Sequence, residues 1–314
     1  MSPSTASRAL NAHGGLAAAT RAAVQDAAAD LNFRPSPLAR SLRTQQTFTV
    51  GFVVPDVSSP FYAAALKGAQ GRLESAGYRV MLMDASQDVA HELAALQTLH
   101  AHQVDGLLLS TAGISRAALD DVAGATPTVF FDSVVAGAGD GAVILDNVRG
   151  IELLVEHLVA HGHERIAFLA GSQTETSGAE RLEAFRAVRP QDGRSVRICE
   201  WSIDDGRRAS LDLVDEPERA TAVTASSAEL ALGFMAAAAE RGLRIPDDVA
   251  LVSFDDPYFG ELLEPSLTAV AYDPCLVGER AADLLVDAMR SGGDAREVRV
   301  PVTLVIRRSC GCDG

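Results

Sequence analysis

The chain of 314 residues is poor in several residue types, and each shortage excludes a class of protein. Four cysteines, Cys199, Cys275, Cys310 and Cys312, are too few and too scattered to form a disulfide framework. No apolar run approaches the roughly 18 residues that a membrane helix needs, and residues 1–30 show no signal peptide. We therefore expect a cytoplasmic protein with no membrane partner.

The sequence also lacks the residue patterns of catalysis and of cofactor binding. Cys310-Gly311-Cys312 could bind a metal ion, but the sequence has no second cysteine pair at a spacing typical of metal ligands. His157 and His161 are four residues apart on a predicted helix, yet they lack the carboxylate of an HExxH motif. No glycine-rich phosphate loop is visible. These absences predict a protein that is not an enzyme and that has neither a metal site nor a cofactor.

Basic residues are unevenly distributed along the chain. The net charge is −15, but residues 1–48 contain five arginines and two aspartates, a balance of +3, which leaves −18 for the rest. A basic head on an acidic body suggests contact with a polyanion through the head, although ordinary scatter would give the same balance. Lys67 is the only lysine among 27 basic residues, which indicates a G+C-rich gene.

Strand and helix patterns alternate from Phe48 onward. Short β-rich runs such as FTVGFVV are separated by helical patterns of about ten to fifteen residues. This alternation predicts right-handed crossovers and parallel sheets. About ten strands and eight helices are too many for one ordinary doubly wound sheet, so we expect two α/β lobes.

Residues 1–47 show no strand pattern. Ser2 and Pro3 can start one helix, a second helical pattern ends near Asn32, and Ser36 can cap a short basic helix. The expected segments are an all-α head at 1–34, a hinge helix with a linker at 35–47, and a two-lobed body at 48–314.

An ordered set of motifs indicates the family. SPSTASRALN and LNFRPSPLARSLRT stand in the head, and the body carries TVGFVVPDVSSPFY, VDGLLLS, HLVAHGHERIAFLAGS, ERLEAFRA, IPDDVALVSFDD, PSLTAV and LVIRRS. From Ser2 to Ser309 the chain resembles the LacI/GalR family of bacterial transcription regulators. The resemblance implies a partial helix-turn-helix head before a two-lobed body of the type I periplasmic-binding-protein-like fold, with parallel sheets.

The resemblance raises a question about the start of the chain. Family members usually carry about fifteen residues before the position of Met1, and these form the first helix and turn of the helix-turn-helix. That position is usually valine, so a GTG codon could have been taken for a start codon, and we favour this interpretation. The alternative is a truncated or exported sugar-binding sensor without DNA-binding activity.

The resemblance places six DNA contacts in the recognition helix. The first residues of such a helix meet base edges in the major groove, and Arg8 suits a bidentate contact to guanine. Other polar side chains hold phosphates, which sets the position of the helix on the duplex. The expected base contacts are Pro3, Ser4 and Arg8, and the expected phosphate contacts are Thr5, Ser7 and Asn11.

The segment LARSLRT is similar to the family's hinge helix. There Leu42 would insert between base pairs in the minor groove, with Ala39 and Arg43 beside it on the DNA. Two hinge helices must pair for this insertion. The resemblance therefore implies a homodimer, or a tetramer, on a near-palindromic operator.

A small effector is expected between the two lobes. Ligands of α/β proteins bind at the carboxyl ends of strands, and polar or aromatic residues follow several predicted strands here. Aromatic faces pack on a sugar ring, while carboxylates, amides and arginine bind paired hydroxyl groups. The expected effector contacts are Asp56, Phe61, Asp132, Asn147, Ser177, Arg181, Trp201, Ser227 and Asp255.

Two positions bear on the identity of the effector. The family usually has Asn-Asp where this chain has Ser227-Ala228, so an ordinary monosaccharide is less secure. Glu175 stands where purine-sensing relatives have a basic residue, which argues against a purine. The sequence thus predicts a DNA-binding regulator, most simply a repressor, controlled by a sugar or a sugar derivative. The effector could either release or promote DNA binding.

Overall fold

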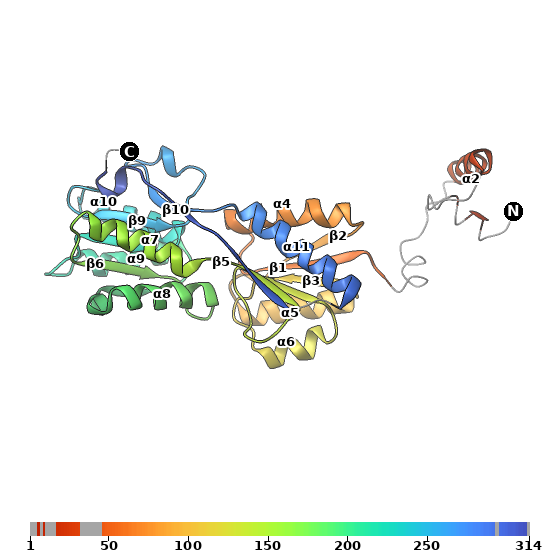
Figure 1. Ribbon diagram of the computed structural model, residues 1–314, viewed down its shortest axis with the longest axis horizontal. Coiled ribbons are helices and arrows are strands. Elements are labelled where there is room, and N and C mark those ends of the chain that lie inside the picture. The colour runs from red at the N-terminus through yellow and green to blue at the C-terminus, as the bar shows by residue number, and fades with distance from the viewer. Residues whose placement is uncertain (1–4, 7–8, 10–16, 32–45, 293–294, 313–314) are drawn as a thin grey trace. The chain divides into compact units, whose positions relative to one another are not determined.

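The computed structural model describes residues 5–6, 9, 17–31, 46–292 and 295–312 (Figure 1). The chain divides into two compact units, Met1–Thr49 and Val50–Gly314. Among the described residues, every helix is too short or too polar to cross a bilayer.

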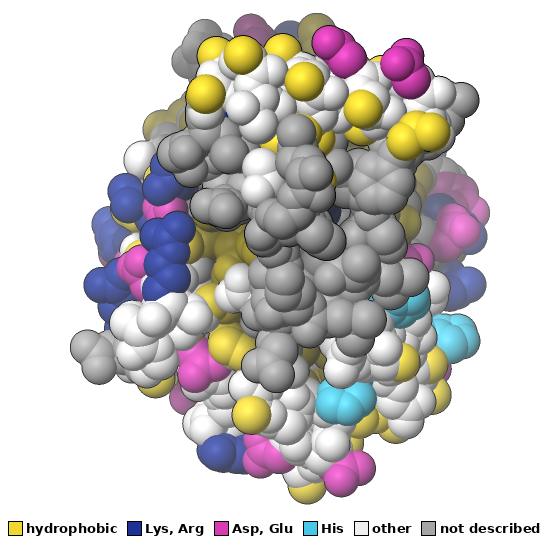
Figure 2. All heavy atoms as spheres, turned by 90° about the vertical axis from the view of Figure 1, so that its right-hand side faces the viewer, with side chains coloured by type: hydrophobic (Ala, Val, Ile, Leu, Met, Phe, Trp, Pro, Cys, Tyr) yellow, Lys and Arg dark blue, Asp and Glu magenta, His cyan; other side chains and the backbone are white. Residues whose placement is uncertain are grey.

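The first unit contains helix α2, Ala18–Asp30, where the sequence predicts the second helix of the head. Its side chains are mostly small and hydrophobic, and Figure 2 shows many of them on the surface. Val24 is its one buried residue. Thr5, Ala6 and Ala9 are also helical, whereas the rest of the first predicted helix and the whole hinge helix lie outside the described residues.

The second unit consists of two α/β lobes, each built on a six-stranded sheet (Figure 1). The strands of the N-terminal lobe are β1 Thr49–Val54, β2 Arg79–Asp84, β3 Gly106–Leu109, β4 Thr128–Phe131, β5 Gly141–Leu145 and β11 Arg296–Val300. The strands of the C-terminal lobe are β6 Ile166–Ala170, β7 Val196–Ile198, β8 Ala222–Ala225, β9 Ala250–Phe254, β10 Thr268–Ala271 and β12 Thr303–Val305.

The strand order places each first strand inside its sheet. The orders are β11-β5-β4-β3-β1-β2 and β12-β10-β9-β8-β6-β7. Parallel pairing joins β1, β3, β4, β5 and β11 in one sheet and β7, β6, β8, β9 and β10 in the other. β12 is antiparallel to β10. The predicted α/β class with two parallel-dominated lobes is confirmed.

Helices cover both faces of each sheet. In the N-terminal lobe these are α4 Pro60–Ser75, α5 Val89–Ala101, α6 Arg116–Ala123 and α11 Pro274–Ser291. In the C-terminal lobe they are α7 Asn147–Ala160, α8 Thr176–Val188, α9 Ile203–Val214 and α10 Ala228–Glu240. α4 packs beside α11 opposite α5 and α6, and α9 packs beside α10 opposite α7 and α8. Short 3-10 turns complete the body at Pro190–Ser195 (η1), Gly260–Leu262 (η2) and Arg308–Cys310 (η3).

The chain crosses between the lobes three times, after β5, after β10 and after β11. The strand and helix patterns of the sequence cover most of these elements but miss α6 and β10. They also predict a single strand for the last β-rich run, VRVPVTLVIRRS. Pro301 has no N–H to continue a ladder, so the run divides there into β11 of one lobe and β12 of the other.

Candidate effector site between the two lobes

A cavity of about 660 Å³ lies between the lobes. Its volume is within the range of about 300–1,000 Å³ that is usual for small-molecule sites. Residues that follow strands or begin helices form its walls, which is where ligands bind in α/β folds. The aromatic residues that line it are Phe61, Tyr62, Trp201, Phe259 and Tyr272.

Two aspartates face the cavity from equivalent places in the two lobes. Asp132 follows Phe131 at the end of β4, and Asp255 follows Phe254 at the end of β9. Both have positive φ angles, 61° and 80°, which residues other than glycine adopt at a cost in free energy. With this backbone conformation, both aspartates line the cavity between the lobes.

In the N-terminal lobe, Asp132 is held by a tyrosine. The Tyr62 hydroxyl donates to Oδ2 of Asp132 at 2.9 Å and lies 3.3 Å from Oγ of Ser110. Burial raises the pKa of Asp132 to about 6, although the charge of Arg181 opposes this shift. Burial and the adjacent carboxylate of Asp132 also raise the pKa of Tyr62 well above its ordinary value.

In the C-terminal lobe, Asp255 has both a tyrosine and an arginine. The Tyr272 hydroxyl donates to Oδ1 of Asp255, and Nη1 of Arg181 lies 3.8 Å from Oδ2. Burial and then the charge of Asp255 raise the pKa of Tyr272 well above its ordinary value. The Arg181 guanidinium carbon lies 3.7 Å from the centre of the Phe254 ring, a cation–π contact.

Arg181 is fixed by two further hydrogen bonds. Its Nε donates to Oδ1 of Asn147 at 2.8 Å, and its Nη1 donates to the carbonyl oxygen of Ser226 at 2.6 Å. The side chain is only 5% exposed. A buried guanidinium with these partners forms a rigid, preorganised donor at the cavity wall.

Trp201 and Glu175 form a second rigid pair in the same lobe. The indole Nε1 donates to Oε1 of Glu175 at 2.8 Å. The ring packs on Gly171, where an added Cβ would lie 2.1 Å from it, so this position has no room for a side chain. Burial, followed by the charge of Asp132, raises the pKa of Glu175 to about 8, so this carboxyl is largely protonated at neutral pH.

Carboxyl groups dominate the charge of the cavity. Six acidic residues line it, Asp56, Asp132, Glu175, Asp204, Glu229 and Asp255, and among the described lining residues Arg181 is the one cation. Such a lining repels anionic ligands and offers many acceptors to hydroxyl groups.

Comparison with known proteins points to one family. A family model described as a periplasmic binding protein-like domain matches residues 155–310. The ribose operon repressor of Halalkalibacterium halodurans is 30% identical over 98% of this chain and 93% of its own length. The chain belongs to the LacI/GalR family.

Solved structures agree with this assignment. The lac repressor dimer bound to operator and the anti-inducer ONPF is 26% identical, with a TM-score of 0.87 over 98% of this chain and 94% of that one. A LacI family transcriptional regulator from Enterococcus faecium with bound ribose is 26% identical, with a TM-score of 0.74 over 83% and 98% of the two chains. These relatives are transcription regulators and not enzymes.

Most of the predicted effector contacts surround the cavity. Eight of the nine line it: Asp56, Phe61, Asp132, Ser177, Arg181, Trp201, Ser227 and Asp255. Asn147 does not, because its side chain is buried between Arg181, to which Oδ1 is bonded, and Glu180, to which Nδ2 donates at 2.8 Å. Asn147 therefore holds the side chain of Arg181 in place without lining the cavity itself.

Sequence reasoning missed the two tyrosines of the cavity. Tyr62 lies beside Phe61 in α4, and Tyr272 follows β10, a strand that the patterns left unassigned. A polar aromatic residue directly after a strand is the signal that would have found Tyr272. Gln87 and Glu229 also line the cavity.

Of the predicted DNA contacts, Thr5 lies among the described residues, in a helical segment. The others lie outside the described residues. These are Pro3, Ser4, Ser7, Arg8 and Asn11 of the predicted recognition helix and Ala39, Leu42 and Arg43 of the predicted hinge.

Proposed function

We propose that this protein is a DNA-binding transcription repressor whose operator affinity is set by a neutral, polyhydroxylated effector, a sugar or a sugar derivative, held between its lobes. The observation that carries the proposal is the combination of aromatic faces with many carboxyl groups and a single buried arginine around one cavity. This combination suits sugar rings and their paired hydroxyl groups.

The charge of the cavity narrows the class of effector. A sugar phosphate would bring at least one negative charge against the five acidic side chains other than the protonated Glu175, with one arginine to balance them. Glu175, largely protonated at neutral pH, can donate as well as accept a hydrogen bond, which suits a hydroxyl group. A neutral sugar therefore meets complementary groups, and an anionic one meets net repulsion.

The proposed mechanism couples lobe closure to DNA binding. An effector that contacts both walls favours one arrangement of the lobes, and its differential affinity shifts the equilibrium between arrangements. In the proposed division of the chain, 1–34 is the DNA-binding head, 35–47 the hinge and 48–314 the effector-binding and dimerisation body. Paired hinges of a homodimer would transmit the change to a near-palindromic operator.

Ligand binding can be followed through Trp201, the only tryptophan of the chain. Because its indole lines the cavity and is bonded to Glu175, a bound sugar should change its fluorescence. We would titrate the full chain with ribose, other monosaccharides, disaccharides and polyols, and in parallel with ribose 5-phosphate and nucleosides. Saturable binding of a neutral sugar but not of its phosphate is expected. Saturation only by the phosphate or by a nucleoside would refute the proposed effector class.

DNA binding requires its own measurement. Band shifts with a near-palindromic site from the upstream region of the gene, with and without the sugar identified above, would test regulation. A chain extended upstream in the reading frame serves as the comparison. Sugar binding without specific DNA retention by either chain would instead support a sensor that does not bind DNA.

A further inference from the structure

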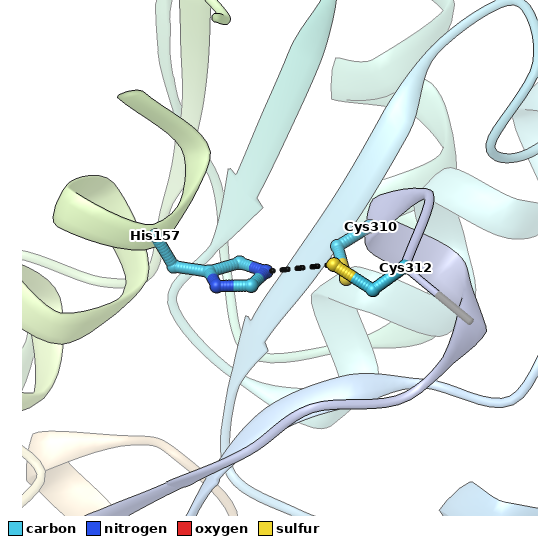
Figure 3. Close-up of side chains that lie close together, drawn as sticks. All are labelled: His157, Cys310 and Cys312. Atoms are coloured by element: carbon cyan, nitrogen blue, oxygen red, sulfur yellow. Dashed lines mark hydrogen bonds between the residues drawn. The ribbon is translucent and has the colours of Figure 1, made fainter. Parts of the chain in front are cut away.

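His157 meets two cysteines from much later in the sequence, Cys310 and Cys312, in the C-terminal lobe and outside the effector cavity (Figure 3). His157 projects from α7 toward Cys310 and Cys312, which lie at and just beyond the end of η3. One ligand atom from each residue lies within 4.8 Å of the other two. Both His157 and Cys310 are buried, at 8% and 3% exposed.

A fourth group adjoins the three. His161 lies one helical turn beyond His157, and the two ring centroids are 4.4 Å apart. Nε2 of His161 is 3.2 Å from Sγ of Cys312, and Nε2 of His157 is 3.7 Å from the same sulfur. His161 thus adds a second imidazole nitrogen beside Cys312, next to the three ligand atoms that lie within 4.8 Å of one another.

A hydrogen bond of His161 fixes which of its ring nitrogens faces the cluster. Nδ1 of His161 lies 2.7 Å from the carbonyl oxygen of His157, and because a carbonyl only accepts, Nδ1 must carry the proton. Nε2 of His161 then presents its lone pair to the cluster. A histidine oriented by such a bond is the usual arrangement at metal centres.

The chain around the cysteines is shaped to bring both sulfurs to one side. Gly311 has a φ of 89°, which glycine adopts without steric strain. Its N–H donates to the carbonyl oxygen of Arg308. The Thr268 hydroxyl lies 3.1 Å from Sγ of Cys310 and 2.9 Å from the carbonyl oxygen of Arg307, and turning its one proton to the sulfur would stabilise a thiolate. The cysteines therefore have a defined turn and a supporting donor.

Two of the distances between ligand atoms are close to those around a tetrahedral ion. With metal bonds of about 2.3 Å to sulfur and about 2.05 Å to nitrogen, tetrahedral geometry puts these atoms about 3.6 Å apart. The two observed distances to Cys312, 3.7 and 3.2 Å, lie on either side of that value. We propose that His157, His161, Cys310 and Cys312 form a Zn²⁺ site.

The site would be structural. Two thiolates and two imidazoles complete the coordination of zinc and leave no open position for a substrate. On binding, both thiols release their protons to solvent, including the one that Cys310 donates to the carbonyl oxygen of Arg307. The ion would fasten the end of the chain to α7, the helix that begins at Asn147 behind Arg181. This inference is independent of the proposed function.

The proposal departs from the sequence-based expectation of no metal site. Cys310-Gly311-Cys312 has no second pair at a known spacing, because its partners lie about 150 residues earlier in the chain. The fold supplies the second pair, and no local motif would reveal it.

A competition assay tests the proposal. The full chain, reduced and stripped of metal by a chelator, would be titrated with Zn²⁺ against a chromogenic chelator, and with Co²⁺ to read geometry from visible absorption. We expect one Zn²⁺ per chain, a raised melting temperature, and the intense bands of tetrahedral cobalt with thiolate charge transfer. Cys312→Ser and His161→Gln should each weaken binding at least about 100-fold.

Matched controls separate this site from nonspecific binding. Cys275→Ser and His163→Gln alter a cysteine and a histidine outside the cluster, since Nδ1 of His163 is turned to Thr221 at 3.0 Å. Both should bind Zn²⁺ as the parent chain does. Zn²⁺ binding that survives Cys312→Ser, octahedral cobalt spectra, or no binding by a chain with both thiols shown to be reduced would each overturn the proposal. Circular dichroism of each variant verifies folding.

Discussion

The two walls of the effector cavity have similar local structure, but they differ in the charge that surrounds their aspartates. Each wall presents an aspartate after a phenylalanine at a strand end, with a positive φ and a tyrosine hydroxyl bonded to its carboxylate. Asp255 of the C-terminal lobe also lies 3.8 Å from the guanidinium of Arg181. Asp132 of the N-terminal lobe makes no ion pair within 4.0 Å among the described residues.

This difference affects the pKa values of the acidic side chains that line the cavity. In the C-terminal lobe, Arg181 compensates the charge of Asp255, and its buried hydrogen bonds fix this wall. In the N-terminal lobe, burial raises the pKa of Asp132 to about 6, and the Asp132 charge in turn helps to raise the pKa of Glu175 to about 8. Similar local geometry therefore leaves Asp255 paired with an arginine, whereas Asp132 has a raised pKa and also raises the pKa of Glu175 on the opposite wall.

Removing the guanidinium should produce the largest effect. Arg181→Met keeps the apolar stem against Phe254 but leaves Asp255 without its cation and Asn147 without its donor. We expect the free energy of unfolding to fall by about 3–5 kcal/mol, since a broken buried pair leaves an uncompensated charge. Urea denaturation measures the loss, and titration of Trp201 fluorescence should show that sugar binding has disappeared.

Arg186→Met is the matched control, because Arg186 is exposed on the same helix. Its free energy of unfolding should change by no more than about 0.5 kcal/mol. Equal stability of the two variants would mean that Arg181 does not fix the C-terminal wall.

The pH dependence of stability tests the titrating groups. Folding raises the pKa of Glu175 from 4.5 to about 8, so the folded state binds its proton more tightly than the unfolded state. The resulting stabilisation is complete below about pH 4.5 and is lost as pH rises through 8. We expect a loss on the order of 5 kcal/mol across this window, measured by denaturation at each pH.

Glu175→Gln should remove most of this decline, leaving the smaller contribution of Asp132 between about pH 4 and 6. Glu183→Gln alters an exposed glutamate of α8 and should keep the full decline. A flat profile for the parent chain would contradict the assignment of a buried, protonated Glu175.

The two tyrosines compare the walls directly. Tyr62→Phe removes a donor from Asp132, which has no adjacent arginine, and should cost about 2 kcal/mol of unfolding free energy. Tyr272→Phe leaves Asp255 with Arg181 and should cost about 1 kcal/mol. Denaturation of both variants and of the double variant gives the values. A larger cost for Tyr272→Phe would reverse the comparison.

The periodic parts of the fold could be predicted from sequence, and so could residues that follow them. Alternating strand and helix patterns predict two parallel lobes, and Asp132 and Asp255 were identified because each follows an apolar strand. The direction in which a side chain points was harder to predict from the sequence. Asn147 comes two residues after β5, and its amide turns to Arg181 and not to the cavity.

Pairings between distant residues could not be predicted. Tyr62 and Asp132 are 70 residues apart, and nothing in SPFY distinguishes the aromatic ring that meets the carboxylate from its neighbour. Cys312 and His157 are separated by 155 residues, so their proximity depends on η3 returning the chain end to α7. Local spacing carries no information about such contacts.

Replacing either of two serines that cap helices should give the smallest effect. The two replacements together distinguish a change in stability from a change in sugar affinity. Ser227 of the C-terminal lobe accepts from the N–H of Leu230, and Ser115 of the N-terminal lobe accepts from the N–H of Ala118, each at 3.3 Å. Replacing either by alanine should cost about 1 kcal/mol of unfolding free energy. Ser227 alone of the two lines the cavity, so only Ser227→Ala should change the affinity for the sugar.

Ser227→Asn sharpens this test, because asparagine caps a helix as well as serine does. It introduces the residue that the family resemblance implies for this position, which lines the cavity. Denaturation should find its stability within about 0.5 kcal/mol of the parent chain. Fluorescence titration should find a changed order of preference among neutral sugars, because the new amide both donates and accepts hydrogen bonds. An unchanged order would mean that position 227 acts only as a cap, and that selectivity resides in the paired aspartates and Arg181.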